Sequence, residues 1–371
     1  MPRVTPRSDP VSRHLDIPDD LSRGEILVLA PSWVGDVVMA TPAFRALREG
    51  LAGARITLLT RPAGARILSG APWFDEVVIF DRHGAGGGIL GFLAQARRLR
   101  AHRYALAVIL PNSLSSALLA RLSGCRRRAG YAPGRGLLLN HAVFPEMEGR
   151  RRRPSYMGDY YLELLGSLGI PSAGRHLELF VTREEEDRCR EFLSRHGVQD
   201  TDEVVALNPG ASFGPSKLWR SDRFARVGDR LARERGARVV VLCGPGEEGL
   251  AAEICALMTE PSIDTSRDRV DLGMLKPLLR RTSLLVTTDT GTRHFGVAFG
   301  RKVVVLMGAT DPRHTEGNLE TTTVVRESVS CSPCHLKVCP IDHRCMERIA
   351  SDRVFDACRE LLHTGRGGDR Q

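Results

Sequence analysis

Short apolar segments that alternate with helical segments, twice along the chain, constrain its fold more than any other feature. The first series of predicted strands lies at residues 25–30, 55–60, 76–80 and 104–110. Apolar residues at helical spacing occupy residues 37–48, 89–102, 114–123 and 156–168. Apolar strands that alternate with helices favour a parallel sheet covered on both faces.

The pattern then restarts. Strands are predicted at residues 176–181, 204–207, 238–242, 284–287 and 302–306, and helices at 184–196, 221–235, 247–258, 272–281 and 292–299. We therefore predict an α/β protein with two Rossmann-like, doubly wound domains, residues 25–175 and 176–350, that face a cleft. Because ligands bind beyond the carboxyl ends of parallel strands, this cleft is the expected active site.

The two ends of the chain differ from these domains. Residues 1–24 are rich in Arg, Pro and Asp and lack the apolar stretch of a secretory signal, so a disordered extension is expected. Residues 351–371 include a short amphipathic helix that we expect to fold back on the first domain. No apolar run reaches the length of a membrane span, which predicts a soluble, intracellular protein.

The chain is basic, with 53 Lys and Arg against 44 Asp and Glu, a formal charge of +9. Arginines gather at residues 97–103, 126–128 and 150–153. Such a surface suits nucleic acid, anionic lipid or a phosphorylated substrate, and solvated charge is an equally good reading. Aromatic residues do not interleave these runs, which disfavours single-stranded nucleic acid.

A loop at residues 287–294 separates a predicted strand from a predicted helix. It offers Asp289, Thr290, Gly291, Thr292 and His294. A glycine at such a turn lets backbone approach a ligand, and amides at a helix start attract anions. The loop therefore predicts a site for a phosphate-bearing ligand.

A second loop, residues 208–219, carries hydroxyls at Ser212 and Ser216 and a cation at Lys217, one of only four lysines. Such a loop can wrap a diphosphate, with lysine as the point charge, or it can be a long connection. It does not have the P-loop spacing. After the next strand, Glu247 or Glu248 could bind ribose hydroxyls or cap a helix.

Asp36 ends the segment P-S-W-V-G-D after the first strand. It either complements the dipole of the following helix or acts as a general base in the cleft.

Two other motifs do not predict a site. Residues 86–91 match G-x-G-x-x-G without a ribose carboxylate after the next strand, and Asp200-Thr-Asp202 is explained by a solvated turn.

A cysteine-rich segment covers residues 331–345. Its cysteines are Cys331, Cys334, Cys339 and Cys345, with His335 and His343 nearby. Their density suggests zinc, although the spacing is not that of a zinc ribbon or finger. Reduced thiols that pack a loop are the other reading.

Several motifs together resemble glycosyltransferase family 9. They are P-S-W-V-G-D-V-V-M-A-T-P-A, N-P-G-A-S-F-G-P-S-K-L-W, T-D-T-G-T-R-H and V-V-V-L-M-G-A-T-D-P. The cysteine-rich segment is similar to the closing module of the heptosyltransferase II branch. The resemblance covers residues 25–363 and implies a GT-B fold, with the acceptor on the first domain and the nucleotide-sugar on the second.

The resemblance also implies a reaction and its site. The donor would be ADP-L-glycero-D-manno-heptose and the acceptor the heptosylated Kdo-lipid A core of lipopolysaccharide, with inversion and without a cofactor or obligatory metal. By position, Asp36 would be the base and Lys217 with Ser212 would hold the diphosphate. The remaining donor residues would be Thr290 and Gly291 for phosphate, Asp289 for the heptose or its own loop, Glu247 or Glu248 for ribose, and His294.

We expect a monomer on the cytoplasmic face of a bacterial inner membrane, with no nucleic-acid partner. Other readings stay open. They are a heptosyltransferase I or III or a transferase of another sugar in the same family, a non-catalytic nucleotide-binding GT-B protein, and a Rossmann oxidoreductase.

Overall fold

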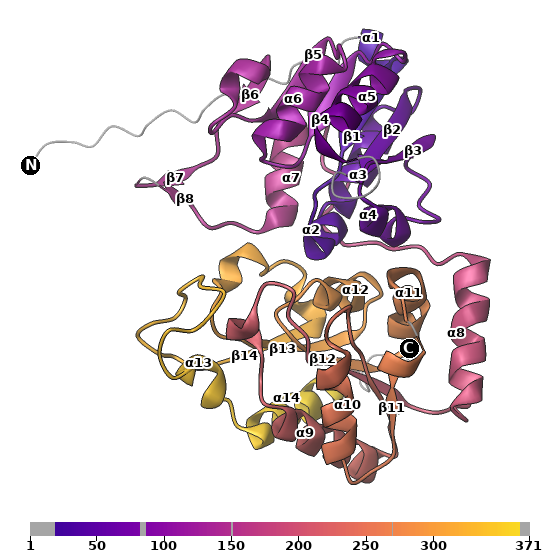
Figure 1. Ribbon diagram of the computed structural model, residues 1–371, viewed down its shortest axis with the longest axis vertical. Helices are drawn as coiled ribbons and strands as arrows, with labels where there is room; N and C mark the ends of the chain where they lie inside the picture. Colours follow the sequence, from indigo (N-terminus) through magenta and orange to yellow (C-terminus); the bar gives the residue numbers. More distant parts are fainter. Residues whose placement is uncertain (1–18, 82–86, 150, 269, 364–371) are drawn as a thin grey trace, which may run out of the picture.

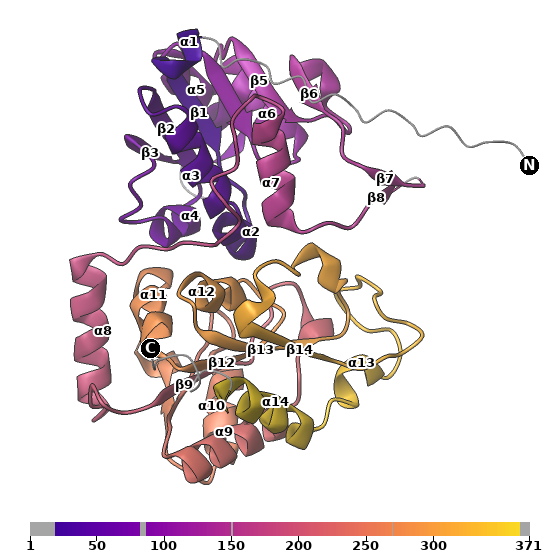
Figure 2. The same cartoon turned by 180° about the vertical axis from the view of Figure 1, so that it is seen from behind.

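The computed structural model describes residues 19–81, 87–149, 151–268 and 270–363. The chain forms two lobes, one above the other, each built on a parallel six-stranded sheet (Figures 1 and 2). The first sheet has the order β3-β2-β1-β4-β5-β6 and the second the order β11-β10-β9-β12-β13-β14. Both orders reverse beside the central strand, which is the doubly wound arrangement that the sequence predicts.

The strands are short and their central members are buried on both faces. In the first lobe they are β1 (Glu25–Leu29), β2 (Arg55–Thr60), β3 (Glu76–Ile79), β4 (Leu106–Ile109), β5 (Arg127–Tyr131) and β6 (His141–Val143). In the second they are β9 (Val204–Asn208), β10 (Arg238–Val241), β11 (Ser262–Asp264), β12 (Leu284–Thr288), β13 (Lys302–Met307) and β14 (Thr322–Arg326). Burial on both faces explains why central strands such as β1, β4, β9 and β12 have nearly continuous apolar sequences.

Helices cover both faces of the first sheet. One face carries α2 (Val34–Met39), α3 (Thr41–Gly50), α4 (Pro62–Ile67) and α7 (Met157–Gly166), and the other carries α5 (Gly88–Arg100) and α6 (Leu114–Leu122). Side chains of β1 alternate between these layers, because Ile26 and Val28 pack with the first group and Leu27 and Leu29 with the second. A small hairpin, β7 (Met147–Glu148) and β8 (Arg151–Arg152), projects from this lobe.

The second lobe repeats the plan. Its helices are α8 (Arg183–Arg195), α9 (Ser221–Arg235), α10 (Glu248–Leu257), α11 (Leu272–Arg281), α12 (Thr292–Ala298), α13 (Arg344–Glu347) and α14 (Ser351–His363). The layer of α8, α11 and α12 belongs to a hydrophobic cluster that runs on into the first lobe. The layer of α9, α10 and α14 closes the other face of the sheet. The lobes therefore share apolar packing on the side of the cleft.

The α/β fold with two facing sheets confirms the sequence prediction, and several details differ. The helix predicted at residues 37–48 is two helices, with Ala40 between them. No strand forms at residues 176–181, because this stretch crosses between the lobes and its backbone bonds to side chains instead. Thr41 accepts from the Glu178 amide, and Arg45 donates to the Ala173 and His176 carbonyls.

The expectation that the last helix packs on the first domain is wrong. Helix α14 lies against α9 and the β12–β14 side of the second sheet, where Val354, Phe355, Cys358 and Leu362 are buried. Its apolar stripe covers a part of this sheet that α9 leaves open, and the Arg230 guanidinium lies 3.7 Å from the centre of the Phe355 ring.

The predicted N-terminal extension is only partly described. Residues 1–18 lie outside the described residues, as do residues 364–371 and Gly86 of the glycine motif. Within the rest of the predicted extension, Asp19–Ser22 forms a helical turn, α1, and Leu21 is buried in the core of the first lobe. No helix in the described ranges is long and apolar enough to cross a bilayer.

Replacing Phe355 by Ala tests the position of α14. The change leaves a cavity in the second lobe, so we expect the free energy of unfolding to fall by about 3–5 kcal/mol. Urea unfolding followed by circular dichroism measures the loss. Phe144→Ala is the matched control, because Phe144 is 78% exposed and its loss should change stability by less than about 0.5 kcal/mol. Equal effects of the two changes would contradict this packing.

Candidate active site

The two lobes touch backbone to backbone where α2 and α12 begin. A Cβ atom added to Gly35 would lie 3.2 Å from the Gly291 Cα, and one added to Gly291 would lie 2.8 Å from the Gly35 nitrogen. Neither glycine has a positive φ, so conformational freedom does not explain them. Both positions accommodate a contact between lobes that leaves no room for a side chain.

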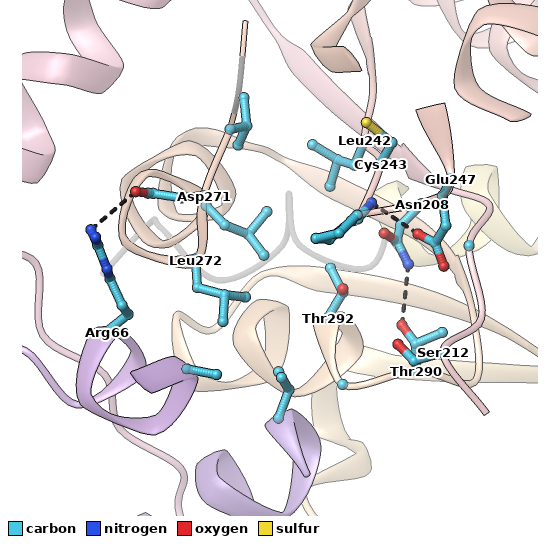
Figure 3. A pocket seen from close by; sticks show the side chains of 18 of the residues that line it. Arg66, Asn208, Ser212, Leu242, Cys243, Glu247, Asp271, Leu272, Thr290 and Thr292 are labelled. Atoms are coloured by element: carbon cyan, nitrogen blue, oxygen red, sulfur yellow. Dashed lines mark hydrogen bonds and ion pairs between the residues drawn. The ribbon is translucent and has the colours of Figure 1, made fainter. Parts of the chain in front are cut away.

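Two adjoining cavities open on either side of this contact. The smaller, about 270 Å³, lies between Asp36 of the first lobe and Lys217, Asp289 and His294 of the second. The larger, about 520 Å³, extends over the carboxyl ends of β9 and β10 (Figure 3). They share four lining residues, which are Val34, Ser212, Thr290 and Gly291. One elongated ligand could therefore occupy both.

Polar contacts hold the lobes together beside the larger cavity. Arg66 of α4 pairs with Asp271 at the start of α11, at 3.1 Å (Figure 3). The fully buried Lys276 ammonium lies 3.0 Å from Glu185 of α8 and donates to the hydroxyl of Ser69 in the first lobe. Because a buried cation is costly without partners, these bonds tie α4, α8 and α11 to one relative position.

Asp36 lies in the first turn of α2, and its carboxyl group lines the smaller cavity. Burial raises its pKa to about 6, although Arg152 acts in the opposite direction. The carboxylate is therefore ionised at pH 7 and binds a proton more readily than an exposed aspartate. This combination suits a general base.

Asp289 faces Asp36 across the cavity and is surrounded by cations. One of its carboxylate oxygens accepts from Lys217 at 2.7 Å and from Thr310 at 2.6 Å, and the other accepts from Arg293 at 3.2 Å. Burial alone would raise the pKa of Asp289, but Lys217 and Arg293 outweigh it and hold the pKa well below its ordinary value. Within this cluster two cations meet one anion, and the ionised Asp36 across the cavity balances the remaining charge. An anionic ligand would therefore be attracted by the Lys217 ammonium itself, as a point charge, and not by a net charge of the cavity.

His294 is buried behind the same loop, against Gly35. Burial and the neighbouring Arg293 lower its pKa to about 3. At neutral pH the imidazole is therefore uncharged, and it can offer a hydrogen bond but not a positive charge to a phosphate.

The loop after β9 is held in place by its neighbours. The Asn208 amide donates to the hydroxyls of Thr287 and Thr290, at 2.9 and 3.1 Å. Thr290 and Ser212 line both cavities and therefore lie where the two meet. Figure 3 shows these two residues at one side of the larger cavity. The structure brings Asp36, Ser212, Lys217, Asp289, Thr290, Gly291 and His294 around one cleft.

The two candidate glutamates separate clearly. Glu247 lines the larger cavity, and its carboxylate accepts the Gly244 amide at 2.9 Å. Glu248 is exposed at the start of α10, where backbone amides lower its pKa. Glu248 therefore fits the alternative of a carboxylate at a helix start, and it does not line the larger cavity. Of the two candidates only Glu247 lies in the cavity, and its role toward a ligand stays a prediction.

The cysteine-rich segment supports the loop that carries Lys217. Ser216 donates its amide to the Lys337 carbonyl and its hydroxyl to the Leu336 carbonyl, and the His343 ring contacts the Ser216 carbonyl at 2.8 Å. Cys345 is buried against Gly308, whereas Cys331 is exposed. In the described ranges, which include all of this segment, no three His, Cys, Asp or Glu side chains are arranged to hold a metal ion.

Sequence reasoning missed several residues of the cleft. The sequence did not predict roles for Arg293, Thr310 or Thr315, or the Arg66–Asp271 pair. Arg293 donates to both Asp289 and the Thr315 hydroxyl. A cation four residues after Asp289 on a helix start was the available signal for this contact.

Two parallel six-stranded sheets face a cleft, and the loops after β9 and β12 of the second lobe line it. This is the GT-B type fold of glycosyltransferases. Residues 92–344 match the model of glycosyltransferase family 9 (heptosyltransferase). The chain belongs to this family and is a glycosyltransferase.

Relatives and solved structures agree with this family. Lipopolysaccharide heptosyltransferase 2 of Salmonella typhimurium is 28% identical and aligns over 81% of this chain and 88% of its own length. Lipooligosaccharide heptosyltransferase 2 of Campylobacter jejuni is 23% identical and aligns over 91% of this chain and 98% of its own length. A family 9 glycosyltransferase from Veillonella parvula superposes with a TM-score of 0.80 at 24% identity, covering 93% of this chain and 99% of that one. E. coli ADP-heptose lps heptosyltransferase II superposes with a TM-score of 0.75 at 23% identity, and the superposition covers 92% of this chain and 99% of that one.

The raised pKa of Asp36 has a measurable effect on stability. In the unfolded chain the pKa of an aspartate is near its ordinary value of 3.8, so above pH 6 the folded protein carries an ionised buried carboxylate, which costs stability. We expect Asp36→Asn to raise the free energy of unfolding at pH 8 by on the order of 1–3 kcal/mol. The gain should shrink as the pH falls from 6 toward 4, where the wild-type group binds a proton in the fold. Thermal melts across this range measure it, and a loss of stability at pH 8 would contradict the buried-base geometry.

Proposed function

We propose that this chain transfers L-glycero-D-manno-heptose from ADP-heptose to the heptosyl-Kdo-lipid A inner core of lipopolysaccharide, with inversion at the anomeric carbon. The names of its relatives support the sugar and the lipopolysaccharide acceptor. One observation of the cleft carries the mechanism: Asp36 and the Lys217–Asp289 pair line the same small cavity from opposite lobes.

The larger cavity suits the ADP part of the donor. Leu242, Val270, Leu272 and Leu275 provide an apolar wall for the adenine. Glu247, which lines this cavity, would accept hydrogen bonds from the ribose, and the diphosphate would run past Ser212, Thr290 and Gly291 toward Lys217. The heptose would then occupy the smaller cavity, where Asp289 orients the sugar or the loop.

The proposed step is a direct displacement. The Asp36 carboxylate takes the proton of the acceptor hydroxyl as its oxygen forms a bond to the anomeric carbon. The bond between that carbon and the diphosphate oxygen breaks, and ADP leaves with the electron pair. Lys217 and Arg293 offset the charge that develops on the departing diphosphate, which lets protein cations supply the electrostatic stabilisation.

The acceptor would reach Asp36 from the first lobe, and the enzyme would work as a monomer at the cytoplasmic face of the inner membrane. Another role within the family is the main alternative, because heptosyltransferase 3 of E. coli is also 26% identical over 75% of this chain. The sugar to which heptose is added therefore needs a direct assay.

Incubation of the purified chain with ADP-heptose and defined truncated lipopolysaccharides, read by mass spectrometry, tests the proposal. We expect one heptose to be added to the acceptor that ends in a single heptose, and no transfer from UDP- or GDP-sugars. Addition to Kdo-lipid A or to a longer core instead would reassign the acceptor. ADP binding without transfer to any acceptor would identify a non-catalytic protein.

Replacing Asp36 by Asn removes the proposed base. Turnover should fall by about two to four decades, while the affinity for ADP changes little. In the wild-type enzyme, kcat/KM should rise with pH through a pKa near 6, because only the ionised carboxylate accepts the proton. A rate in Asp36→Asn within about threefold of wild type would remove Asp36 from the chemistry.

The adjacent glutamates offer a matched pair of variants. Glu247→Gln should weaken ADP binding by about tenfold or more, as expected for a lost charge-assisted hydrogen bond, because the amide is a poorer acceptor for ribose hydroxyls. Glu248→Gln, one residue further along, should leave ADP affinity within about twofold. Calorimetric titration with ADP measures both. Equal weakening in the two variants would reject Glu247 as the ribose ligand.

A further inference from the structure

Helices α5 and α6 lie side by side on the outside of the first sheet (Figure 1) and present apolar side chains to solvent. Ile89 and Leu90 are 80% and 83% exposed. The full set is Ile89, Leu90 and Leu93 of α5 with Leu114, Leu118 and Leu122 of α6, which we call the α5–α6 face. Scattered exposed leucines are ordinary, but six large aliphatic residues on two adjacent helices are typical of an interaction surface.

The inner sides of the same helices explain why these residues do not turn inward. Small side chains fill the contact with the sheet, with Ala96 on α5 and Ala117 and Ala120 on α6. On α6 the exposed leucines recur every four residues, so they form one stripe opposite the buried alanines. The outward stripe is thus a consequence of the helical register.

The chain that forms this face is basic, and the acidic residue beside it is Asp81, which lines a pocket with Gly91, Ala94 and Arg98 of α5. Between Asp81 and Glu146 the sequence contains ten arginines and neither aspartate nor glutamate. Since the whole chain has a formal charge of +9, this stretch accounts for its net basicity. Four of the arginines, Arg97, Arg98, Arg100 and Arg121, are exposed in the last turns of α5 and α6.

We propose that the α5–α6 face is a docking surface for an anionic phospholipid bilayer. The aliphatic residues would enter the headgroup region, and the arginine stems would lie along the surface with their guanidinium groups at lipid phosphates. Four exposed arginines on the two helices beside an apolar stripe match this partner, because a second copy of the chain would bring the same four cations against them.

The orientation of the face fits the reaction. Both helices begin at the carboxyl edge of the first sheet, which is also the edge where α2 carries Asp36. Ile89, Leu90 and Leu114 are in their first turns. Docking would bring the cleft toward the bilayer, where a lipid-anchored acceptor lies. This placement rests on the proposed function, although binding to the bilayer does not require it.

Flotation of the full chain with vesicles tests the proposal. We expect binding to phosphatidylcholine vesicles that contain phosphatidylglycerol, little binding to pure phosphatidylcholine, and a decline with added salt. The double variant Leu90→Ser, Leu118→Ser should lose about tenfold or more in vesicle partitioning, because two aliphatic side chains no longer enter the bilayer. Arg97→Gln and Arg98→Gln should each cost roughly fivefold.

Leu93→Ser and Leu257→Ser form a matched control. Both leucines are 47% exposed on a helix, and Leu257 lies on α10 of the second lobe. Only Leu93→Ser should weaken vesicle binding. Transfer to a detergent-solubilised acceptor should be unchanged in all these variants, so a failure of membrane docking is distinguishable from a failure of the proposed reaction.

Two results would overturn the proposal. One is equal binding to neutral and anionic vesicles, or none to either. The other is a change in oligomeric state by sedimentation when the α5–α6 residues are replaced, with vesicle binding unaltered, which would assign the face to contacts between copies of the chain.

Discussion

The contact between Gly35 and Gly291 sets the geometry on which the rest of the cleft depends. The starts of α2 and α12 approach so closely that a single methyl group at Gly291 would meet the backbone of the other lobe at 2.8 Å. This approach carries Asp36 to the cavity that holds Lys217 and Asp289. The buried Lys276, which bonds to both lobes, holds them from the side, and the more exposed Arg66–Asp271 pair lies beside it. The site is therefore a property of the relative position of the two lobes.

Electrostatics divides the roles of the two aspartates in this cavity. Asp289 is held ionised by Lys217 and Arg293, which makes it a permanent anchor for the cations rather than a proton acceptor. The pKa of Asp36 is raised by burial, which outweighs the opposing charge of Arg152, so Asp36 is the group able to exchange a proton near neutral pH. Two carboxyl groups whose environments push their pKa values apart in this way are typical of enzymes that separate charge stabilisation from proton transfer.

Much of this arrangement could be predicted from sequence, because it is encoded locally. Apolar strands such as residues 204–208 and 284–288, and the loops that follow them, read directly as parallel strands with ligand sites at their ends. Contacts with residues far away in the sequence could not be predicted from the sequence. The amphipathic stripe of α14 shows that it packs, but not on which lobe. Neither the choice between Glu247 and Glu248 nor the pairing of Arg66 with Asp271 follows from neighbouring residues, since both depend on how a loop or lobe is placed in space.

A crystal structure of the chain with ADP tests the central claim most directly, namely that one cleft joins the phosphate loops of the second lobe to the carboxylate of the first. We predict that the adenosine lies in the cavity lined by Leu242 and Glu247. The terminal phosphate should lie within hydrogen-bonding distance of Lys217 or Thr290, in the cavity that Asp36 enters. A diphosphate bound away from that junction, with Asp36 facing only solvent, would contradict the account.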